Sequence, residues 1–479
     1  MVTTRIASAF LGLTGAILQP TNPDPVAQTI RDWIAKQEQD LRAGYTLYQR
    51  YYKGEQDVHL TNRLRQFLPT DLKFRDNFCG LVVDTLAERL TVQSFASPTD
   101  EALTEWAQEI WRLNRMDQEQ IVVHSEALLN GDAYVLVDYD AEEQRPRLTY
   151  QPADTITPRY DSVTRKLAYV AKKWLVQANG QDGPVTRMNL YYPERIEKYV
   201  LYGAVWRPFE DEGDLAWPLP WLDQVGAPLG ITLIHFRNQP MGDDFGSSEL
   251  ANIVPIQDLL NKALVDLVMI LDTLGFAQRW GIGIDAPAST FRTAPGSFWN
   301  MKSSDPASAK VGQFESAAVD GPLKTIETLI QHISAISRTP QHLFQMAGGA
   351  PSGEALKTSE SGLVHKAKLR QVGFGNAWED VIRAAARLES AFGSQVFIDP
   401  SVEAQWKDPE THNEESFIAA LGIKRTQLGV PEVQIWREAG YSAEQIAQML
   451  QDKQDEQVAS SNIGAAILQS FNSGEPGQV

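Results

Sequence analysis

The segment PIQDLLNKALVDLVMILDTLG, which runs from Pro255 to Gly275, decides how this chain is organised. Its apolar residues recur every three or four positions, so they fall along one stripe of a helix. The residues of that stripe are Ile256, Leu260, Ala263, Leu264, Leu267, Ile270, Leu271 and Leu274. A second segment, PLKTIETLIQHISAISRTP from Pro322 to Pro340, has the same spacing and ends at a proline, which cannot continue a helix.

These two predicted helices can lie side by side as a stalk, with residues 276–321 projecting from one end as a tip. Within the tip, FAQRWGIGI (276–284) predicts a strand. After the second helix, the Gly- and Pro-rich stretch QHLFQMAGGAPSGEA predicts a loop. A third helix is predicted from about Glu354 to Phe392, with a bend near Gly373 and Gly375 because glycine weakens a helix.

The chain before the stalk divides into a helical part and a strand-rich part. Residues 24–130 carry apolar side chains at helical spacing, and Asn130-Gly131-Asp132 is a turn signal. After that turn come short β-branched and aromatic runs such as AYVLVDYD, LAYVAKKWLVQ and ITLIHFRN, which predict antiparallel strands. A helical layer against a β-meander predicts an α+β fold. From His412 onward the pattern predicts several short helices.

The composition narrows the classes of function. The 479 residues include 43 basic and 61 acidic side chains, a net charge of −18, which excludes a chain that grips nucleic acid over its whole surface. A protein that lets a polyanion slide past without sticking remains compatible with this charge. The single cysteine, Cys79, excludes an internal disulfide and a thiolate-rich metal site. Its apolar setting predicts a buried structural thiol, and an intracellular origin follows.

An apolar run near the N-terminus, IASAFLGLTGAIL (6–18), resembles the start of a secretory signal. It is too short to span a bilayer, which needs roughly 20 apolar residues. A short packed helix or an arm is therefore the prediction, and anchoring of a scaffold to the cell envelope through this run is the alternative.

Catalytic and cofactor motifs are missing from the sequence. It contains no G-x-x-x-x-G-K-[ST], no H-E-x-x-H and no complete G-x-S-x-G. The glycines Gly281 and Gly283 follow a predicted strand, but a proline at 287 replaces the helix that a dinucleotide site requires. We therefore predict no enzyme, no catalytic residue, no metal site and no cofactor.

Three stretches leave a choice between a functional and an ordinary role. Asp138 and Asp140, followed by two glutamates, suit either a metal-binding or hydrolytic carboxylate cluster or a solvated strand end, and the strand end is favoured. The basic residues His365, Lys366, Lys368 and Arg370 suit either DNA contact or a solvated or subunit-contact helix face, and the helix face is favoured. The loop after Pro340, with exposed His342, Gln345 and Met346, suits a plain connector and a moving functional loop equally.

Six short motifs are spread along most of the chain. They are Tyr51-Tyr52-Lys53-Gly54; Asn77-Phe78-Cys79-Gly80-Leu81-Val82-Val83-Asp84 with Glu88-Arg89-Leu90; Ala127-Leu128-Leu129-Asn130-Gly131-Asp132-Ala133-Tyr134-Val135; Phe245-Gly246-Ser247-Ser248-Glu249-Leu250; Pro351-Ser352-Gly353-Glu354-Ala355-Leu356; and Ala439-Gly440-Tyr441-Ser442-Ala443-Glu444-Gln445-Ile446. With the order helix, tip, helix, loop and long helix, these motifs make the chain resemble the portal proteins of tailed bacteriophages, the head-to-tail connectors of the capsid.

The resemblance implies a division of the chain into the parts of a portal subunit. These are a wing at 1–250, a first stem helix at 251–275, a clip at 276–321, a second stem helix at 322–338, a channel loop at 339–353, a long wing helix and connector at 354–410, and a helical crown with a disordered tail at 411–479. Portal subunits assemble as closed rings, usually of twelve, at one vertex of the capsid. A ring of neighbours would bury the apolar stripes that a lone stalk of about 30 Å leaves open.

The resemblance also implies sites and partners. The channel loop residues would be Gln341, His342, Gln345, Met346, Gly348 and Gly349. The channel wall or outer surface of the stem would carry Asp258, Lys262, Asp266, Asp272 and Glu327. The clip would contact partners through Arg279, Trp280, Arg292, Phe298 and Trp299, because aromatic residues and arginine dominate interfaces; packing within the clip is the alternative for Trp280 and Phe298.

The expected partners are other copies of the chain, a terminase motor, a head-tail adaptor, the major capsid and scaffold proteins, and double-stranded DNA that passes without sequence specificity. No membrane is expected. The protein would be assembled in the host cytoplasm and reside in the virion. The alternatives from other classes are an intracellular hydrolase with carboxylates between Asp138 and Asp161, and the envelope-associated scaffold.

Overall fold

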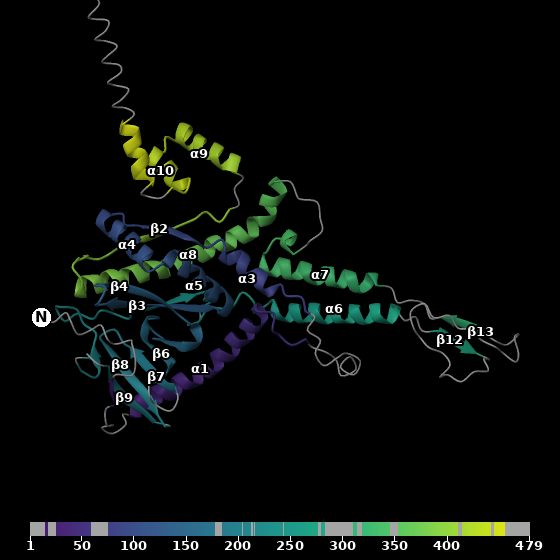
Figure 1. Ribbon diagram of the computed structural model, residues 1–479, viewed down its shortest axis with the longest axis horizontal. Coiled ribbons are helices and arrows are strands. Elements are labelled where there is room, and N and C mark those ends of the chain that lie inside the picture. The colour runs from purple at the N-terminus through teal and green to yellow at the C-terminus, as the bar shows by residue number, and fades with distance from the viewer. Residues whose placement is uncertain are drawn as a thin grey trace, which may run out of the picture. The chain divides into compact units, whose positions relative to one another are not determined.

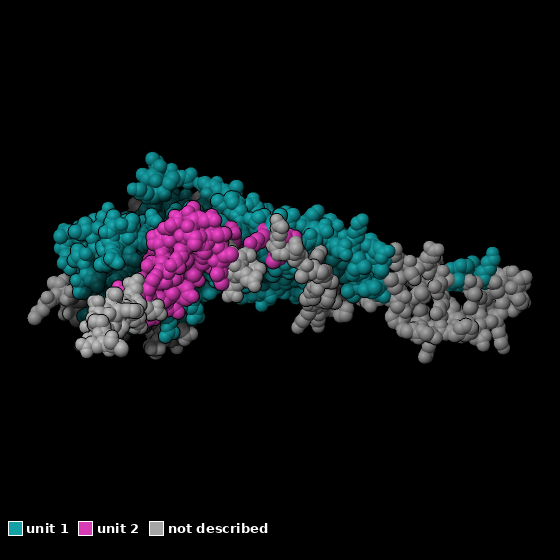
Figure 2. Space-filling view, turned by 90° about the horizontal axis from the view of Figure 1, so that it is seen from above, with its two compact units in different colours: residues 1–351, 358–409 teal, residues 352–357, 410–479 magenta. Residues whose placement is uncertain are grey.

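A computed structural model of the 479-residue chain describes residues 15–17, 25–58, 75–177, 184–203, 205–211, 214, 216–242, 244–275, 279–282, 310–313, 319–344, 353–410, 414–441 and 445–455 (Figure 1). The chain divides into two compact units, which Figure 2 colours separately. Unit 1 comprises Met1–Pro351 and Thr358–Pro409, and unit 2 comprises Ser352–Lys357 and Glu410–Val479.

The helices of the N-terminal part of unit 1 follow the predicted apolar spacing. They are α1 Pro25–Tyr52, α3 Cys79–Ala87, α4 Glu101–Leu113 and α5 Met116–Asn130. The helix α4 begins at a side-chain cap, because Asp100 accepts a hydrogen bond from the Leu103 amide at 3.1 Å. The helix α5 ends at Gly131, whose φ of 95° suits glycine.

The strands form one large antiparallel sheet and three smaller ones. The large sheet has the order β1 Gly15–Ile17, β9 Val205–Asp211, β8 Arg195–Tyr202, β7 Pro184–Tyr191, β6 Leu167–Gln177 and β5 Ile156–Tyr160, with β10 Leu219–Pro220 paired to β8. The second sheet has the order β11 Leu233–Arg237, β3 Asp132–Asp140 and β4 Arg145–Gln151. The two-stranded sheets pair β14 Glu403–Trp406 with β2 Val92–Ala96, and β12 Arg279–Ile282 with β13 Lys310–Gln313.

The predicted stalk is present as two helices that lie side by side, α6 Val254–Gly275 and α7 Asp320–Ser337 (Figure 1). A 3₁₀ turn, Gln341–Leu343, follows α7. The third helix, α8 Gly353–Phe392, spans 40 residues and passes through Gly373 and Gly375 without interruption. At Gly375 a Cβ atom would lie 3.1 Å from Trp406 Nε1, so this glycine leaves room for β14.

The main core of unit 1 gathers aromatic side chains from helices and strands around α8. Trp378 is fully buried on α8, and its indole N–H donates to Nε2 of His124 at 2.8 Å. Nδ1 of the same ring is 3.0 Å from the Leu90 carbonyl, so the proton of the neutral imidazole resides on Nδ1. Burial lowers the pKa of His124 to about 4, which agrees with a neutral ring.

Unit 2 is helical in the part that the structure describes. Its named helices are α9 Glu414–Leu428 and α10 Glu432–Glu438, and residues 445–455 are also helical. Arg425 and Lys453 both pair with Glu432, and Lys424 pairs with Glu438 at 2.6 Å. The short helices expected after His412 are therefore confirmed within the described residues.

The α+β class is confirmed, and one local expectation needs correction. Gly15–Ile17 forms strand β1 at the edge of the large sheet, opposite Phe209–Asp211 of β9. Of the two predictions for this run, a helix is therefore wrong at these three residues and an arm agrees with them, since backbone pairing with β9 decides their conformation. The composition and length of this run, on which the prediction relied, cannot reveal a strand partner so far along the chain.

Candidate functional site

The stalk buries a narrow apolar seam and leaves other apolar residues open. Leu260 and Val265 of α6 and Ile333 of α7 are fully buried. Partly buried residues continue the seam: Ile256, Leu264, Ile326, Leu329 and Ile330. About half of each of four further side chains is exposed, namely Leu259 at 56% and Leu271 at 51% on α6, and Leu323 at 44% and Ile336 at 50% on α7. Two helices alone thus do not cover the apolar surface of the stalk.

The predicted stalk charges occupy different environments. Lys262 and Asp266 form an ion pair of 2.6 Å one turn apart on α6, and both side chains are partly exposed. Glu327 is exposed on α7. Asp258 is half-buried and accepts a hydrogen bond of 2.6 Å from the Tyr51 hydroxyl of α1. Asp272 lies in α6, but its side chain is outside the described residues.

The first turns of α6 are fastened to the start of α3 by buried amides. The side chain of Gln257 donates to the Asp76 carbonyl at 2.9 Å and accepts from the Phe78 amide at 3.1 Å. The Asn261 side chain accepts from the Asp76 amide at 2.9 Å. Cys79 beside them is buried, and burial raises the pKa of its thiol to about 12, so the predicted structural thiol is confirmed.

The motifs that contain Gly131 and Gly246 contact each other just before the start of α6. A Cβ atom on Gly246 would lie 2.0 Å from the Gly131 carbonyl oxygen, so the two backbones touch only because both residues are glycine. The Gly246 amide donates to Asp132 at 2.8 Å, and the Glu249 amide donates to the Leu128 carbonyl at 2.9 Å. The end of α5 and the entry to α6 therefore form one backbone-to-backbone junction.

Asp132 at this junction belongs to a buried side-chain network. Its carboxylate accepts from the Tyr45 hydroxyl at 2.9 Å and from Nε2 of His235 at 2.8 Å. The other nitrogen of His235, Nδ1, accepts from the Tyr160 hydroxyl at 2.9 Å. Burial lowers the pKa of His235, although Asp132 opposes that shift. The network joins α1, β3, β5 and β11 at the entry to the stalk.

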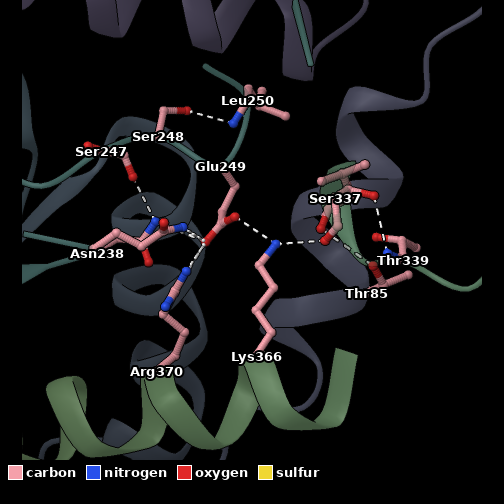
Figure 3. A network of polar contacts seen from close by, with 12 residues as sticks. Thr85, Asn238, Ser247, Ser248, Glu249, Leu250, Ser337, Thr339, Lys366 and Arg370 are labelled. Carbon is pink, nitrogen blue, oxygen red and sulfur yellow. Dashed lines mark hydrogen bonds and ion pairs between the residues drawn. The ribbon is translucent and has the colours of Figure 1, made fainter. Parts of the chain in front are cut away.

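Glu249 is the centre of a second buried network, which joins the entry of α6 to α8 (Figure 3). Its Oε2 is 2.7 Å from Nζ of Lys366, and its Oε1 is 2.9 Å from a guanidinium nitrogen of Arg370. The side-chain amides of Asn238 and Gln239 also donate to Oε1, at 3.1 and 2.9 Å. All three charged side chains are at most 12% exposed.

The charges of this network explain the titration of its carboxyl group. Burial by itself raises the pKa of Glu249, but Lys366 and Arg370 outweigh it and lower the pKa to about 2. Burial lowers the pKa of Lys366, and Glu249 partly opposes that shift. Glu249 is therefore ionised at neutral pH and holds two cations of α8.

The same lysine reaches the end of α7. Nζ of Lys366 donates to the Ser337 carbonyl at 2.9 Å (Figure 3). Arg338 follows in the left-handed conformation, with φ of 59°, and ends the helix. The Ser334 hydroxyl donates to the Thr339 carbonyl at 2.7 Å. These contacts define the C-terminal end of α7.

The predicted loop residues begin just beyond this point. Gln341 is exposed, whereas His342 is half-buried, with Nε2 4.0 Å from Glu360 of α8, so the expected exposure of His342 is wrong. Glu360 pairs with Arg89 of α3 at 3.1 Å. Phe344 is buried edge-to-face on Phe78 at 5.3 Å. The remaining predicted loop residues, Gln345, Met346, Gly348 and Gly349, lie outside the described residues.

The comparison with known proteins accounts for this arrangement. Residues 31–459 match the family model "Phage portal protein, SPP1 Gp6-like". The chain belongs to this phage portal family. It is 24% identical over 458 residues to a portal protein of Mycobacterium phage D29, covering 89% of this chain and 87% of that protein. It is 23% identical over 355 residues to a portal protein of Mycobacterium phage L5, covering 69% and 68%.

Because the chain belongs to the portal family, its general function is known. It is a structural component of the phage capsid that forms a ring at one vertex. Double-stranded DNA is packaged and ejected through that ring, which also serves as a docking platform. No helix within the described ranges is long and apolar enough to cross a membrane.

The predicted contact residues of the portal tip are only partly described. Trp280 of β12 is half-buried, and its indole packs against Gly312 of β13, where a Cβ atom would lie 2.6 Å from the ring. This contact favours local packing for Trp280. The side chain of Arg279 and the residues Arg292, Phe298 and Trp299 lie outside the described residues.

The carboxylates considered for hydrolysis belong to a strand end. Arg147 of β4 is 3.2 Å from Asp138 and 3.3 Å from Asp140, so one guanidinium lies against both carboxylates. Within the part of the chain that the structure describes, no group of three or more His, Cys, Asp or Glu side chains could hold a metal ion. The favoured reading of a strand end is confirmed, although Asp138 is mostly buried rather than solvated.

The basic stretch of α8 needs a correction. His365 and Lys368 are exposed, as a helix face predicts. Lys366 and Arg370 instead point inward to Glu249, so the solvated or subunit-contact face is wrong for them. Because Lys366 and Arg370 are four residues apart, the sequence indicates that they share one face of the helix. The sequence did not reveal that an acidic partner lies more than one hundred residues earlier.

Proposed function

We propose that the stalk is the stem of a closed ring, usually of twelve subunits, and that α6 and α7 surround the DNA channel. The observation that carries this proposal is the exposure of Leu259, Leu271, Leu323 and Ile336 on the two helices. An apolar surface of this kind is stabilised when a neighbour covers it, by about 25 cal/mol for each Å² removed from water. A ring supplies that neighbour on both sides of every stalk.

The remaining parts of the portal subunit follow from this assignment. The wing comprises residues 1–250 together with α8, in the segment 354–410. The clip is residues 276–321, and the crown is residues 411–479, whose start is next to the boundary of unit 2 at Glu410. Residues 339–353 line the narrowest part of the channel and resist backflow of DNA.

The channel wall carries a mostly acidic set of charges in this proposal. Asp266, Asp272 and Glu327 are the acidic candidates, and Lys262 offsets one of them. Asp258 instead fastens the stem to α1 through Tyr51. Repulsion between an acidic wall and the phosphates keeps DNA from adhering while it slides.

The partners of the ring bind its exposed ends and rim. A terminase motor docks at the clip, where Arg279, Arg292, Phe298 and Trp299 supply the contacts while Trp280 packs against Gly312, and an adaptor protein joins the tail. The major capsid and scaffold proteins surround the ring, which is assembled in the cytoplasm of the host. The portal needs no cofactor, because the motor hydrolyses ATP.

Deletion of Ala347–Pro351 tests the role of the channel loop. The expected result is that capsids with this ring still package DNA but lose it faster once the motor is removed. DNA packaged per capsid and DNA retained over time are the two measurements. Deletion of residues 180 and 181 between β6 and β7 is the control, because it shortens a connection of the wing, leaves four residues between the paired Gln177 and Pro184, and should change neither value. Unchanged packaging and retention in the loop deletion would contradict the role.

A further inference from the structure

Lys366 is placed differently from the other cation that Glu249 holds. Its ammonium group contacts the Glu249 carboxylate at 2.7 Å and the Ser337 carbonyl at 2.9 Å. The guanidinium of Arg370 binds Glu249 at 2.9 Å. The Lys366 side chain thus contacts both the entry of α6 and the end of α7.

We propose that Lys366 is a positioning residue for DNA passage, which fixes the C-terminal end of α7 to α8 and to the entry of α6. This inference rests on the proposed function, in which α6 and α7 form the channel. Movement of either stem helix is then passed to the long helix of the wing, because both helices are bound to the same ammonium group.

The chemistry of this position requires a lysine-like side chain. The last carbonyls of a helix carry partial negative charge, so a cation at the end of α7 is favourable. The Glu249 carboxylate and the Ser337 carbonyl both need N–H donors, and one ammonium group has three N–H donors to offer. Glu249 forms an ion pair with Lys366, so the buried ammonium group is not left without a counter-charge. The side-chain amides of Asn238 and Gln239 donate further hydrogen bonds to the same carboxylate.

Two substitutions separate the effect of losing the contact with α7 from the effect of losing one positive charge next to Glu249. Lys366→Met and Arg370→Met each remove one cation, and each leaves Glu249 paired with the other. Both keep an unbranched apolar chain in the site. Only K366M removes the hydrogen bond to the Ser337 carbonyl, so R370M is a matched control for loss of charge and for loss of stability.

Hydrogen exchange on the assembled ring provides the first readout. In K366M, amides of residues 334–344 are expected to exchange about tenfold faster, the effect of losing one hydrogen bond from a charged donor. In R370M, these amides should exchange at the wild-type rate. Equal acceleration in both variants would overturn the inference, because it would show a general loss of stability.

DNA retention in packaged capsids provides the second readout. K366M is expected to package DNA and then lose more of it than R370M or wild type after the motor is removed. Equal retention in K366M and R370M would overturn the positioning role even if exchange at α7 is faster. Failure of K366M to form rings that R370M forms would also overturn it, because Lys366 would then be needed for folding. The deletion of Ala347–Pro351 tests the channel separately, since it leaves Lys366 and Ser337 in place.

Discussion

Glu126 is a buried carboxyl group on α5, close to the junction that supports the stalk. Its Oε1 accepts from the Ala153 amide at 3.1 Å and from the Asn130 side chain at 3.2 Å, and the Tyr150 hydroxyl also donates to the carboxyl group. Burial raises its pKa from 4.5 to about 7, although hydrogen bonds from Tyr150 and Ala153 oppose the shift. The protonated form therefore suits the folded state better than the ionised form.

This raised pKa predicts a pH dependence of stability. The stabilisation is fully present below about 4.5 and is lost as the pH rises through about 7, with an upper limit on the order of 3 kcal/mol. Glu126→Gln should flatten the decline in unfolding temperature between pH 5 and pH 8. Glu105→Gln, which changes an exposed carboxyl group on α4, is the control. An unaltered pH profile in E126Q would show that Glu126 does not titrate in this range.

At the same residue scale, the sequence motifs identified residues of the junction and of the Glu249 network, but they did not predict which residues contact one another. Glycines 131 and 246 belong to two separate motifs, and their close approach explains why both lack a side chain. Lys366 and Arg370 were recognisable as a basic pair one helical turn apart. Their partner Glu249 could not be identified, because helical spacing reports which residues share a face and not what that face meets.

At the scale of elements, the two glycines of α8 have different roles. A Cβ atom on Gly373 would meet nothing within 4 Å, whereas one on Gly375 would lie 3.1 Å from Trp406 Nε1 and 3.9 Å from Ala404 Cβ. Trp406 also packs against His124, with ring centroids 5.5 Å apart, so it has limited room to yield.

This difference predicts opposite effects of the same substitution. Gly373→Ala should raise the free energy of unfolding by about 0.5–1 kcal/mol, because alanine favours a helix interior. Gly375→Ala should lower it, because the added methyl group displaces Trp406 and strand β14. Denaturant unfolding of the two variants measures both values, and a gain in each would contradict the packing explanation for Gly375.

Elements with strong periodicity could be predicted from the sequence, and elements defined by distant pairing could not. The stalk helices, α8, strands β6, β7 and β8 of the large sheet and all three strands of the second sheet were predicted from the sequence pattern, and their boundaries match within a few residues. Strands β2 and β14 are short and pair across more than three hundred residues, so no local turn signal marks them. Strand β9 contains Pro208, which weakens a strand pattern.

At the scale of the whole molecule, the net charge of the ring affects how DNA passes through it. Each chain carries a net charge of −18, so twelve copies would carry roughly −200. Such a ring repels the phosphate backbone except where basic residues are clustered. The buried positions of Lys366 and Arg370 remove two of the basic side chains of α8 from any surface that DNA could touch.

The most direct test of the central claim is native mass measurement of the purified protein, with imaging of the same sample. A ring of twelve chains of 53.4 kDa predicts a particle of about 640 kDa. Images should show a closed ring with a central hole wide enough for double-stranded DNA. A species of 53.4 kDa without rings, under conditions where the chain is folded, would contradict the account.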